Sequence, residues 1–235
     1  MLPVAILAGG LASRLGGITK NTPKSMVPIN GKPFIDWQLR LLAKHKITEV
    51  VLCVSHLSEQ IIDFVGDGSH WEINVKYSED GSLQLGTGGA LLKALPLLGE
   101  NFGVIYGDSF LLTDYKNIND AFVNLNTRCL MTVFKNSGLY EKSNIHYFDK
   151  KIINYDKNTL NINMQYIDYG LLYFNKSAFL EKDIGTSFDI SSLLSYWISQ
   201  GNVEGLEVYN RFYEIGSLVG MKELSEFLNW REYEL

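Results

Sequence analysis

Short apolar runs alternate with segments of helical periodicity through the first 134 residues, and this alternation is what most constrains the fold. The apolar runs predict buried strands at 2–8, 49–55, 73–78, 102–106 and 128–134. The segments between them predict helices at 34–46, 58–65, 88–95 and 114–124. This order predicts an α/β fold, a Rossmann-like mostly parallel sheet with helices on both faces.

The pattern changes in the second half of the chain, where several short strands are predicted in succession. We expect strands at 143–148, 151–156, 165–174 and 203–209, and helices at 188–200 and from 218 onward. The sequence contains no repeat, no low-complexity tract and no linker. We therefore expect a single domain over 1–235, whose second half lies over the carboxyl edge of the same sheet.

Composition excludes several classes of protein. The 235 residues are 46% hydrophobic, which provides a substantial core, and the net charge is −5. Without a basic block, the chain has no electrostatic footprint for duplex nucleic acid or an anionic membrane. No apolar run approaches the length of a membrane span, and Cys53 and Cys129 lie in apolar runs typical of reduced core thiols. We expect a cytoplasmic protein that binds neither nucleic acid nor membrane, and we expect its four tryptophans to pack in the interior.

Glycine-rich and polar groups follow the predicted strands, where ligands bind in open α/β sheets. The first loop joins Gly9 and Gly10 to Arg14 and Lys24. Its glycines let backbone N–H groups approach phosphates, and its cations supply positive charge. The loop has neither the GxxxxGK[ST] nor the GxGxxG spacing, so an ordinary strand–helix turn remains an alternative.

Two further groups carry both a functional and a structural interpretation. The glycines at 86, 88 and 89 open a predicted helix, and they allow either close approach to a base or sugar or simply a tight helix start. Asp108 follows a strand, where it suits either a helix N-cap or a Mg²⁺ ligand.

These motifs, in this order and spacing, resemble the sugar-1-phosphate nucleotidyltransferases of the glucose-1-phosphate thymidylyltransferase type. The resemblance covers essentially the whole chain and continues through the segments 155–157, 167–170 and 212–217. Within that family the chain looks most like the D-glycero-D-manno-heptose-1-phosphate guanylyltransferases. It departs from the usual pattern at Ala12 and Ser13, which replace Gly-Thr, and at Glu214, which replaces aspartate.

The resemblance implies the nucleotide-diphospho-sugar transferase type of fold, with about 1–134 binding the nucleotide and about 135–235 the sugar phosphate. It also implies a reaction in which an NTP and a sugar 1-phosphate give an NDP-sugar and pyrophosphate. In that reaction an anion approaches a polyanion, so the protein must chiefly neutralise charge and position the reactants.

The resemblance also implies roles for individual residues. Arg14 would bind the β- and γ-phosphates, and Lys24 would stabilise charge at the α-phosphorus. Asp108 and Glu214 would hold Mg²⁺. The implied nucleotide-binding residues are Leu7, Ala8, Gly9, Gly10, Ser13, Gln84, Gly86, Thr87 and Gly107. The implied sugar-phosphate-binding residues are Lys157, Asp168, Gly170 and Asp189, although Asp189 equally suits a helix N-terminus.

Several alternatives remain open at this point. GTP and D-glycero-D-manno-heptose 1-phosphate, in bacterial surface-glycan synthesis, are the substrates that the resemblance favours. UTP, dTTP or CTP with another hexose or amino-sugar 1-phosphate is the alternative. A non-catalytic nucleotide-sugar regulator has the same fold, but the presence of Arg14, Lys24 and Asp108 disfavours it. A nicotinamide oxidoreductase is disfavoured because this sequence lacks the GxGxxG dinucleotide-binding motif. No sequence pattern decides whether the protein forms a homo-oligomer.

Overall fold

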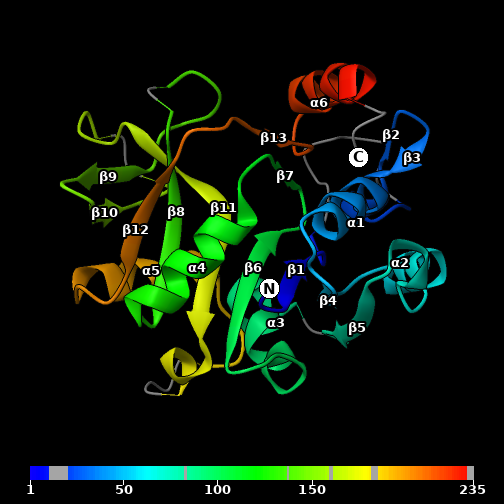
Figure 1. Cartoon of the computed structure of the whole chain (residues 1–235), viewed down its shortest axis with the longest axis horizontal. Coiled ribbons are helices and arrows are strands. Elements are labelled where there is room, and N and C mark those ends of the chain that lie inside the picture. The colour runs from blue at the N-terminus through cyan, green and yellow to red at the C-terminus, as the bar shows by residue number, and fades with distance from the viewer. Residues whose placement is uncertain (11–20, 82–83, 137, 159–160, 181–184, 232–235) are drawn as a thin grey trace.

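The structure, a computed structural model, describes residues 1–10, 21–81, 84–136, 138–158, 161–180 and 185–231. Its central feature is a nine-stranded sheet in the order β5-β4-β1-β6-β11-β8-β12-β10-β9 (Figure 1). The strands are β1 (Val4–Leu7), β4 (Glu49–Val54), β5 (Asn74–Glu79), β6 (Asn101–Tyr106), β8 (Cys129–Lys135), β9 (Ile145–Phe148), β10 (Lys151–Tyr155), β11 (Tyr166–Asn175) and β12 (Glu204–Val208).

The predicted mostly parallel sheet is confirmed, with two strands that run against the rest. Strands β5, β4, β1 and β6 pair in parallel, as do β8 and β12. The long strand β11 lies between β6 and β8 and is antiparallel to both. β10 is antiparallel to its two neighbours. The alternating pattern of the first half predicted the direction of β8 correctly, but it did not reveal that β11 would separate β8 from β6.

The predicted helices on both faces are also confirmed. Successive side chains of a strand point to opposite faces, so Val4 and Ile6 enter one core while Ala5 and Leu7 enter the other. The helices of the first core are α1 (Phe34–Lys44), α2 (Ser58–Val65), α4 (Tyr115–Leu125) and α6 (Leu218–Arg231). Those of the second core are α3 (Gly86–Ala94) and α5 (Ile190–Ser199).

The second half of the chain extends this sheet sideways rather than only lying over its edge. β11 pairs with β6 from Leu171↔Ile105 to Asn175↔Asn101, so strands from both halves share one sheet. Figure 1 shows β9 and β10 at one end of the molecule and β5 at the other. The start of β11 and the segments that follow β10 and β12 bring Asp168, Lys157 and Glu214 to the cavity at the carboxyl edge.

Two small two-stranded ribbons were not predicted from the sequence. β7 (Ser109–Leu111) pairs with β13 (Phe212–Glu214) in antiparallel fashion, and β2 (Pro28–Ile29) pairs with β3 (Lys32–Pro33). The turn of 3₁₀ helix at Lys24–Met26 precedes the second ribbon. Each strand is three residues or fewer, too short to show a periodicity in the sequence.

The expectation of buried thiols is confirmed, and the expectation of interior tryptophans is wrong at one position. Cys53 and Cys129 are buried free thiols. Trp37, Trp71 and Trp197 are buried, but Trp230 is 91% exposed. The buried stripe of α6 is formed by Leu224 and Leu228, four residues apart. Trp230 is two residues beyond Leu228 and six beyond Leu224, which turns its side chain by about 200° and about 240° from them at 3.6 residues per turn, so it lies off that stripe.

No helix in the described part of the chain is long and apolar enough to cross a membrane.

Candidate active site

A cavity of about 910 Å³ opens at the carboxyl edge of β1, β4, β5 and β6. Each of these strands delivers lining residues just beyond its end: residues 8–10 after β1, Ser55 and His56 after β4, Asp80 after β5, and Asp108 after β6. This is the edge at which open α/β sheets bind their ligands, as the sequence analysis expected.

Most of the predicted site residues meet in this one cavity, although they come from distant parts of the sequence. Those that line it are Leu7, Ala8, Gly9, Gly10, Lys24, Gln84, Gly86, Thr87, Gly107, Asp108, Lys157, Asp168 and Glu214. Gly170 and Asp189 are absent from the lining, though both contact residues that belong to it. Ser13 and Arg14 lie outside the described residues.

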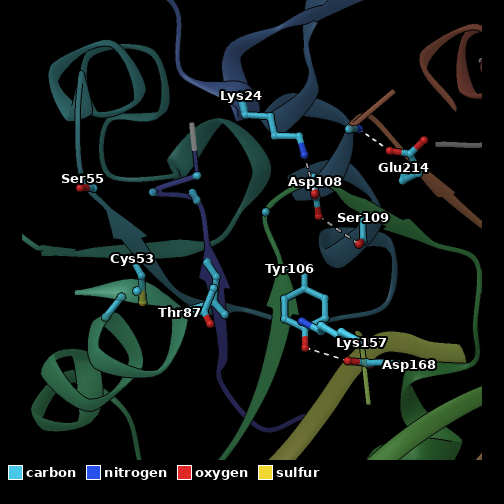
Figure 2. Close-up of a pocket in the computed structure, with 18 of the residues that line it drawn as sticks. Lys24, Cys53, Ser55, Thr87, Tyr106, Asp108, Ser109, Lys157, Asp168 and Glu214 are labelled. Atoms are coloured by element: carbon cyan, nitrogen blue, oxygen red, sulfur yellow. Dashed lines mark hydrogen bonds and ion pairs between the residues drawn. The ribbon is translucent and has the colours of Figure 1, made fainter. Parts of the chain in front are cut away.

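An ion pair between Lys24 and Asp108 forms the centre of the site. Lys24 Nζ lies 2.6 Å from Asp108 Oδ2, across 84 residues of sequence (Figure 2). Asp108 also accepts a hydrogen bond from Ser109 Oγ at 3.4 Å. The Lys24 side chain is 17% exposed and that of Asp108 37%, so both can still meet a ligand.

The β7–β13 ribbon brings Glu214 to the same place. Glu214 stands opposite Ser109 in the ribbon, and the N–H of Ile215 donates to the carbonyl of Asp108 at 3.0 Å. The Glu214 carboxylate accepts hydrogen bonds from the Gly216 N–H, from the Ser217 N–H at 3.1 Å and from Ser217 Oγ at 2.5 Å. It therefore also fixes the turn that leads into α6.

Asp108 and Glu214 fit a magnesium ion that is shared with a nucleotide. A Cβ added at Gly216 would stand 2.8 Å from Glu214 Oε2, 2.9 Å from Lys24 Nζ and 3.8 Å from Asp108 Oδ2, so both carboxylates face one point. Mg²⁺ prefers oxygen ligands and commonly takes one or two carboxylates, with phosphates and water completing its shell. Among the described residues no group of three or more His, Cys, Asp and Glu could hold a metal without such help.

Lys157 stands on the second-half side of the cavity, beside two tyrosine rings. Its Nζ lies 5.7 Å from the ring centroid of Tyr106 and 5.9 Å from that of Tyr155, within cation–π range. It also lies 3.9 Å from Asp189 Oδ1. Burial alone would raise the pKa of Asp189, but hydrogen bonds from Ser191 and the charge of Lys157 outweigh it and lower that pKa.

Asp168 is a partly buried carboxylate whose two oxygens both accept hydrogen bonds from protein groups. Its Oδ2 accepts from the hydroxyls of Tyr106 at 2.8 Å and Tyr155 at 3.2 Å, and its Oδ1 accepts from the Gly170 N–H at 3.0 Å. Burial raises the pKa of Asp168, and the charge of Lys157 opposes that shift. Burial likewise raises the pKa of the Tyr106 hydroxyl, with the nearby Asp168 as the next cause.

The glycines at 86, 88 and 89 serve a packing purpose in this structure. A Cβ at Gly88 would fall 2.1 Å from the ring of Phe188, and one at Gly89 would fall 2.4 Å from the carbonyl oxygen of Thr186. The N–H of Gly88 donates to the Phe188 carbonyl at 2.9 Å. These contacts join the start of α3 to the segment before α5, which agrees with the structural interpretation of these glycines.

Thr87 and Asp189 both cap α5. Thr87 Oγ1 accepts from the N–H of Ile190 at 2.9 Å. Asp189 accepts from the N–H of Ser191 at 2.8 Å. The helix-terminus interpretation of Asp189 is thereby confirmed, while its 3.9 Å approach to Lys157 keeps it beside the site.

Several lining residues were missed by the sequence analysis. Ser55, His56 and Asp80 directly follow strands, so the strand-end rule could have found them. Burial raises the pKa of Asp80, with the charge of Lys93 opposing it. Asn144, in contrast, lies before β9 in a segment without a recognisable motif.

The comparison with known families decides which family the chain belongs to. The sequence pattern described as "Nucleotidyl transferase" matches residues 4–204. The chain belongs to this family. A relative from Neisseria meningitidis, an N-acetylmuramate alpha-1-phosphate uridylyltransferase, is 42% identical over 110 residues, which are 46% of this chain and 47% of the relative.

A second relative is a D-glycero-alpha-D-manno-heptose 1-phosphate guanylyltransferase from Campylobacter jejuni, 40% identical over 113 residues. That match covers 48% of this chain and 50% of the relative, so the chain matches about half the length of both. HddC from Yersinia pseudotuberculosis, solved with GMP-PN, has the same fold with a TM-score of 0.80 and 23% identity, over 97% of this chain and 100% of that one.

Proposed function

We propose that this protein is a sugar-1-phosphate nucleotidyltransferase. An oxygen of the sugar 1-phosphate attacks the α-phosphorus of an NTP, and the bond from that phosphorus to the oxygen bridging to the β-phosphate breaks. The bonding pair leaves with pyrophosphate, and the NDP-sugar remains. The family to which the chain belongs supports this reaction, and so do its relatives' activities on sugar phosphates.

The observation that carries the proposal is the cluster of Lys24, Asp108 and Glu214 at the carboxyl edge of the sheet. In phosphoryl transfer the protein contributes mainly positioning and charge stabilisation. Lys24 would place its ammonium at the α-phosphate, where negative charge converges during attack. Mg²⁺ bound by Asp108 and Glu214 would neutralise charge on the phosphate oxygens.

The remaining roles belong to the proposal as well. Arg14 would bind the leaving pyrophosphate, and Ser13 would bind the nucleotide in the same loop. The other nucleotide-binding residues proposed are Leu7, Ala8, Gly9, Gly10, Gln84, Gly86, Thr87 and Gly107. Lys157, with Asp189 beside it, would hold the sugar phosphate. Asp168 and Gly170 would complete the sugar-phosphate half of the site. We propose that one domain, 1–235, carries both halves, with the sugar-phosphate half in about 135–235.

We propose GTP and D-glycero-D-manno-heptose 1-phosphate as the substrates, in the cytoplasm and in bacterial surface-glycan synthesis. The Campylobacter jejuni relative is named for that pair of substrates. The Neisseria meningitidis relative favours the alternative, UTP with N-acetylmuramate 1-phosphate. The two relatives have similar identity to this chain, so the choice between them rests on experiment.

A pyrophosphate-release assay tests the proposal. The purified protein is incubated with Mg²⁺ and each of GTP, UTP, dTTP, CTP and ATP, in combination with a panel of sugar 1-phosphates. We expect release that requires both substrates, with the highest kcat/KM for GTP and the heptose 1-phosphate. Release with N-acetylmuramate 1-phosphate and UTP alone would replace the substrate assignment. No release with any pair would contradict the reaction itself.

A further inference from the structure

The network around Asp168 gives this carboxylate a different task from direct sugar binding. Three donors already occupy it: the hydroxyls of Tyr106 and Tyr155 on Oδ2, and the Gly170 N–H on Oδ1. Its own N–H donates to Asn144 Oδ1 at 3.0 Å, so the backbone is held too. These donors take three of the roughly four acceptor sites of the carboxylate, so its oxygens are held mainly by protein groups before any substrate arrives.

The two tyrosines that donate to Asp168 are the same two whose rings lie within about 6 Å of the Lys157 ammonium. Figure 2 shows the Lys157 side chain against the Tyr106 ring, with the Tyr106 hydroxyl directed at Asp168. The ring of Tyr155 is also near this ammonium, with Nζ 5.9 Å from its ring centroid. Because both hydroxyls share one acceptor, Asp168 sets the orientation of both rings and thereby the place of the Lys157 ammonium.

We propose that Asp168 is a positioning residue for Lys157, acting through Tyr106 and Tyr155, and that it places the lysine to receive the phosphate of the sugar 1-phosphate. This inference rests on the proposed function for the identity of that substrate. Asp168 acts on the phosphate end of the substrate without touching the sugar hydroxyls.

Asp168→Asn is the primary test. With its NH₂ at the Oδ1 position the amide faces the Gly170 N–H, which can only donate. With its NH₂ at the Oδ2 position it no longer accepts from the Tyr106 and Tyr155 hydroxyls. In both orientations the negative charge near Lys157 is lost. We expect the KM for the sugar 1-phosphate and the Ki of inorganic phosphate, as its competitor, to rise about tenfold and by the same factor. The KM for the nucleotide should change less than twofold.

Inorganic phosphate separates this role from direct sugar contact because it has no sugar hydroxyls. A higher KM for the sugar 1-phosphate with an unchanged Ki for phosphate would make Asp168 a sugar ligand and overturn the inference. Unchanged values for both would overturn it as well. Asp120→Asn is the control: its carboxylate lies on α4 in an exposed pair with Lys116, and both constants should match wild type.

Tyr155→Phe keeps the inference testable if Asp168→Asn does not fold. Tyr155 is 2% exposed and does not line the cavity, so it cannot contact a substrate directly. Removing its hydroxyl leaves the ring in the core and removes one of the bonds that hold Asp168. We expect both constants to rise about threefold together, and no change in either would overturn the inference.

Wild-type controls separate this inference from the proposed function. Absence of pyrophosphate release by the wild type would contradict the proposed function. In that case calorimetric titration of wild type and Asp168→Asn with inorganic phosphate still tests the positioning role. Normal turnover by the wild type with equal phosphate affinity in the two proteins would contradict the positioning role alone.

Discussion

At the scale of single residues, Asp108 has the clearest expected effect. Its carboxylate pairs with Lys24. The carboxylates of Asp108 and Glu214 both lie within 4 Å of the position that a Cβ would take at Gly216. Asp108→Asn keeps the shape but removes the charge that would hold a metal ion. We expect kcat for pyrophosphate release to fall about 10²–10³-fold, the order seen when one strong electrostatic contact is lost. The melting curve should remain cooperative, and near-normal turnover would remove Asp108 from the metal site.

Lys24→Ala should affect turnover more than nucleotide binding. The ammonium is needed most where negative charge converges during attack, so its loss raises the barrier more than the ground-state free energy. We expect kcat to fall about 10²-fold, with only a few-fold change in the nucleotide KM. Steady-state kinetics with saturating sugar 1-phosphate measure both. A large rise in KM at unchanged kcat would instead make Lys24 a ground-state phosphate ligand.

The raised pKa of Asp168 predicts a pH-dependent stability. Burial is the main cause, with the charge of Lys157 opposing it. A carboxyl whose pKa is higher in the folded state favours folding at low pH, and this contribution is lost as pH rises from about 3.9 through the folded pKa. Asp168→Asn has no such titration. The free energy of unfolding of wild type, minus that of Asp168→Asn, should therefore decline as pH rises over this window. Urea unfolding at several pH values measures it, and a difference that increases with pH would contradict the prediction.

At the scale of elements, the junction of α3 and α5 depends on glycines. A Cβ at Gly89 would meet the backbone oxygen of Thr186 at 2.4 Å, and backbone cannot move aside as a side chain can. We expect Gly89→Ala to lower the free energy of unfolding by about 1–3 kcal/mol, the usual cost of overpacking. Urea unfolding tests it against Gly99→Ala, where the nearest contact is an ordinary 3.7 Å and little change is expected.

The sequence predicted the long elements and missed those that complete the site. Periodicity over five or more residues found the large helices and most strands of the main sheet, because burial of one face imposes that periodicity. The β7–β13 ribbon has three residues per strand, and its pairing depends on tertiary contacts between segments a hundred residues apart. Glu214 was therefore found through the family resemblance and not through any local pattern.

The same limit applies to the partners of the predicted site residues. Asp168 and Lys157 were predicted, but the two tyrosines that connect them were not. Tyr106 ends a buried strand and Tyr155 is part of the core, so both have the apolar context of ordinary packing residues. Only the three-dimensional structure shows that their hydroxyls share one carboxylate.

At the scale of the whole molecule, the cavity connects segments from Leu7 to Gly216, so a bound nucleotide should stabilise the entire fold. The unfolded chain has no such site, and a ligand at a hundred times its Kd adds about 2.7 kcal/mol to the free energy of unfolding. For a chain of this size that corresponds to a rise in Tm of about 5–10 °C.

Thermal unfolding with Mg²⁺ and each nucleotide at one concentration then ranks the bases without a sugar substrate. We expect GTP to give the largest rise in Tm. A nucleotide that binds tenfold more weakly should add about 1.4 kcal/mol less at the same saturating concentration. A larger rise with UTP than with GTP would contradict guanine preference and leave nucleotidyl transfer intact. Equal Tm values with and without every nucleotide would mean that this cavity does not bind them, because a ligand that binds only the folded state must raise Tm.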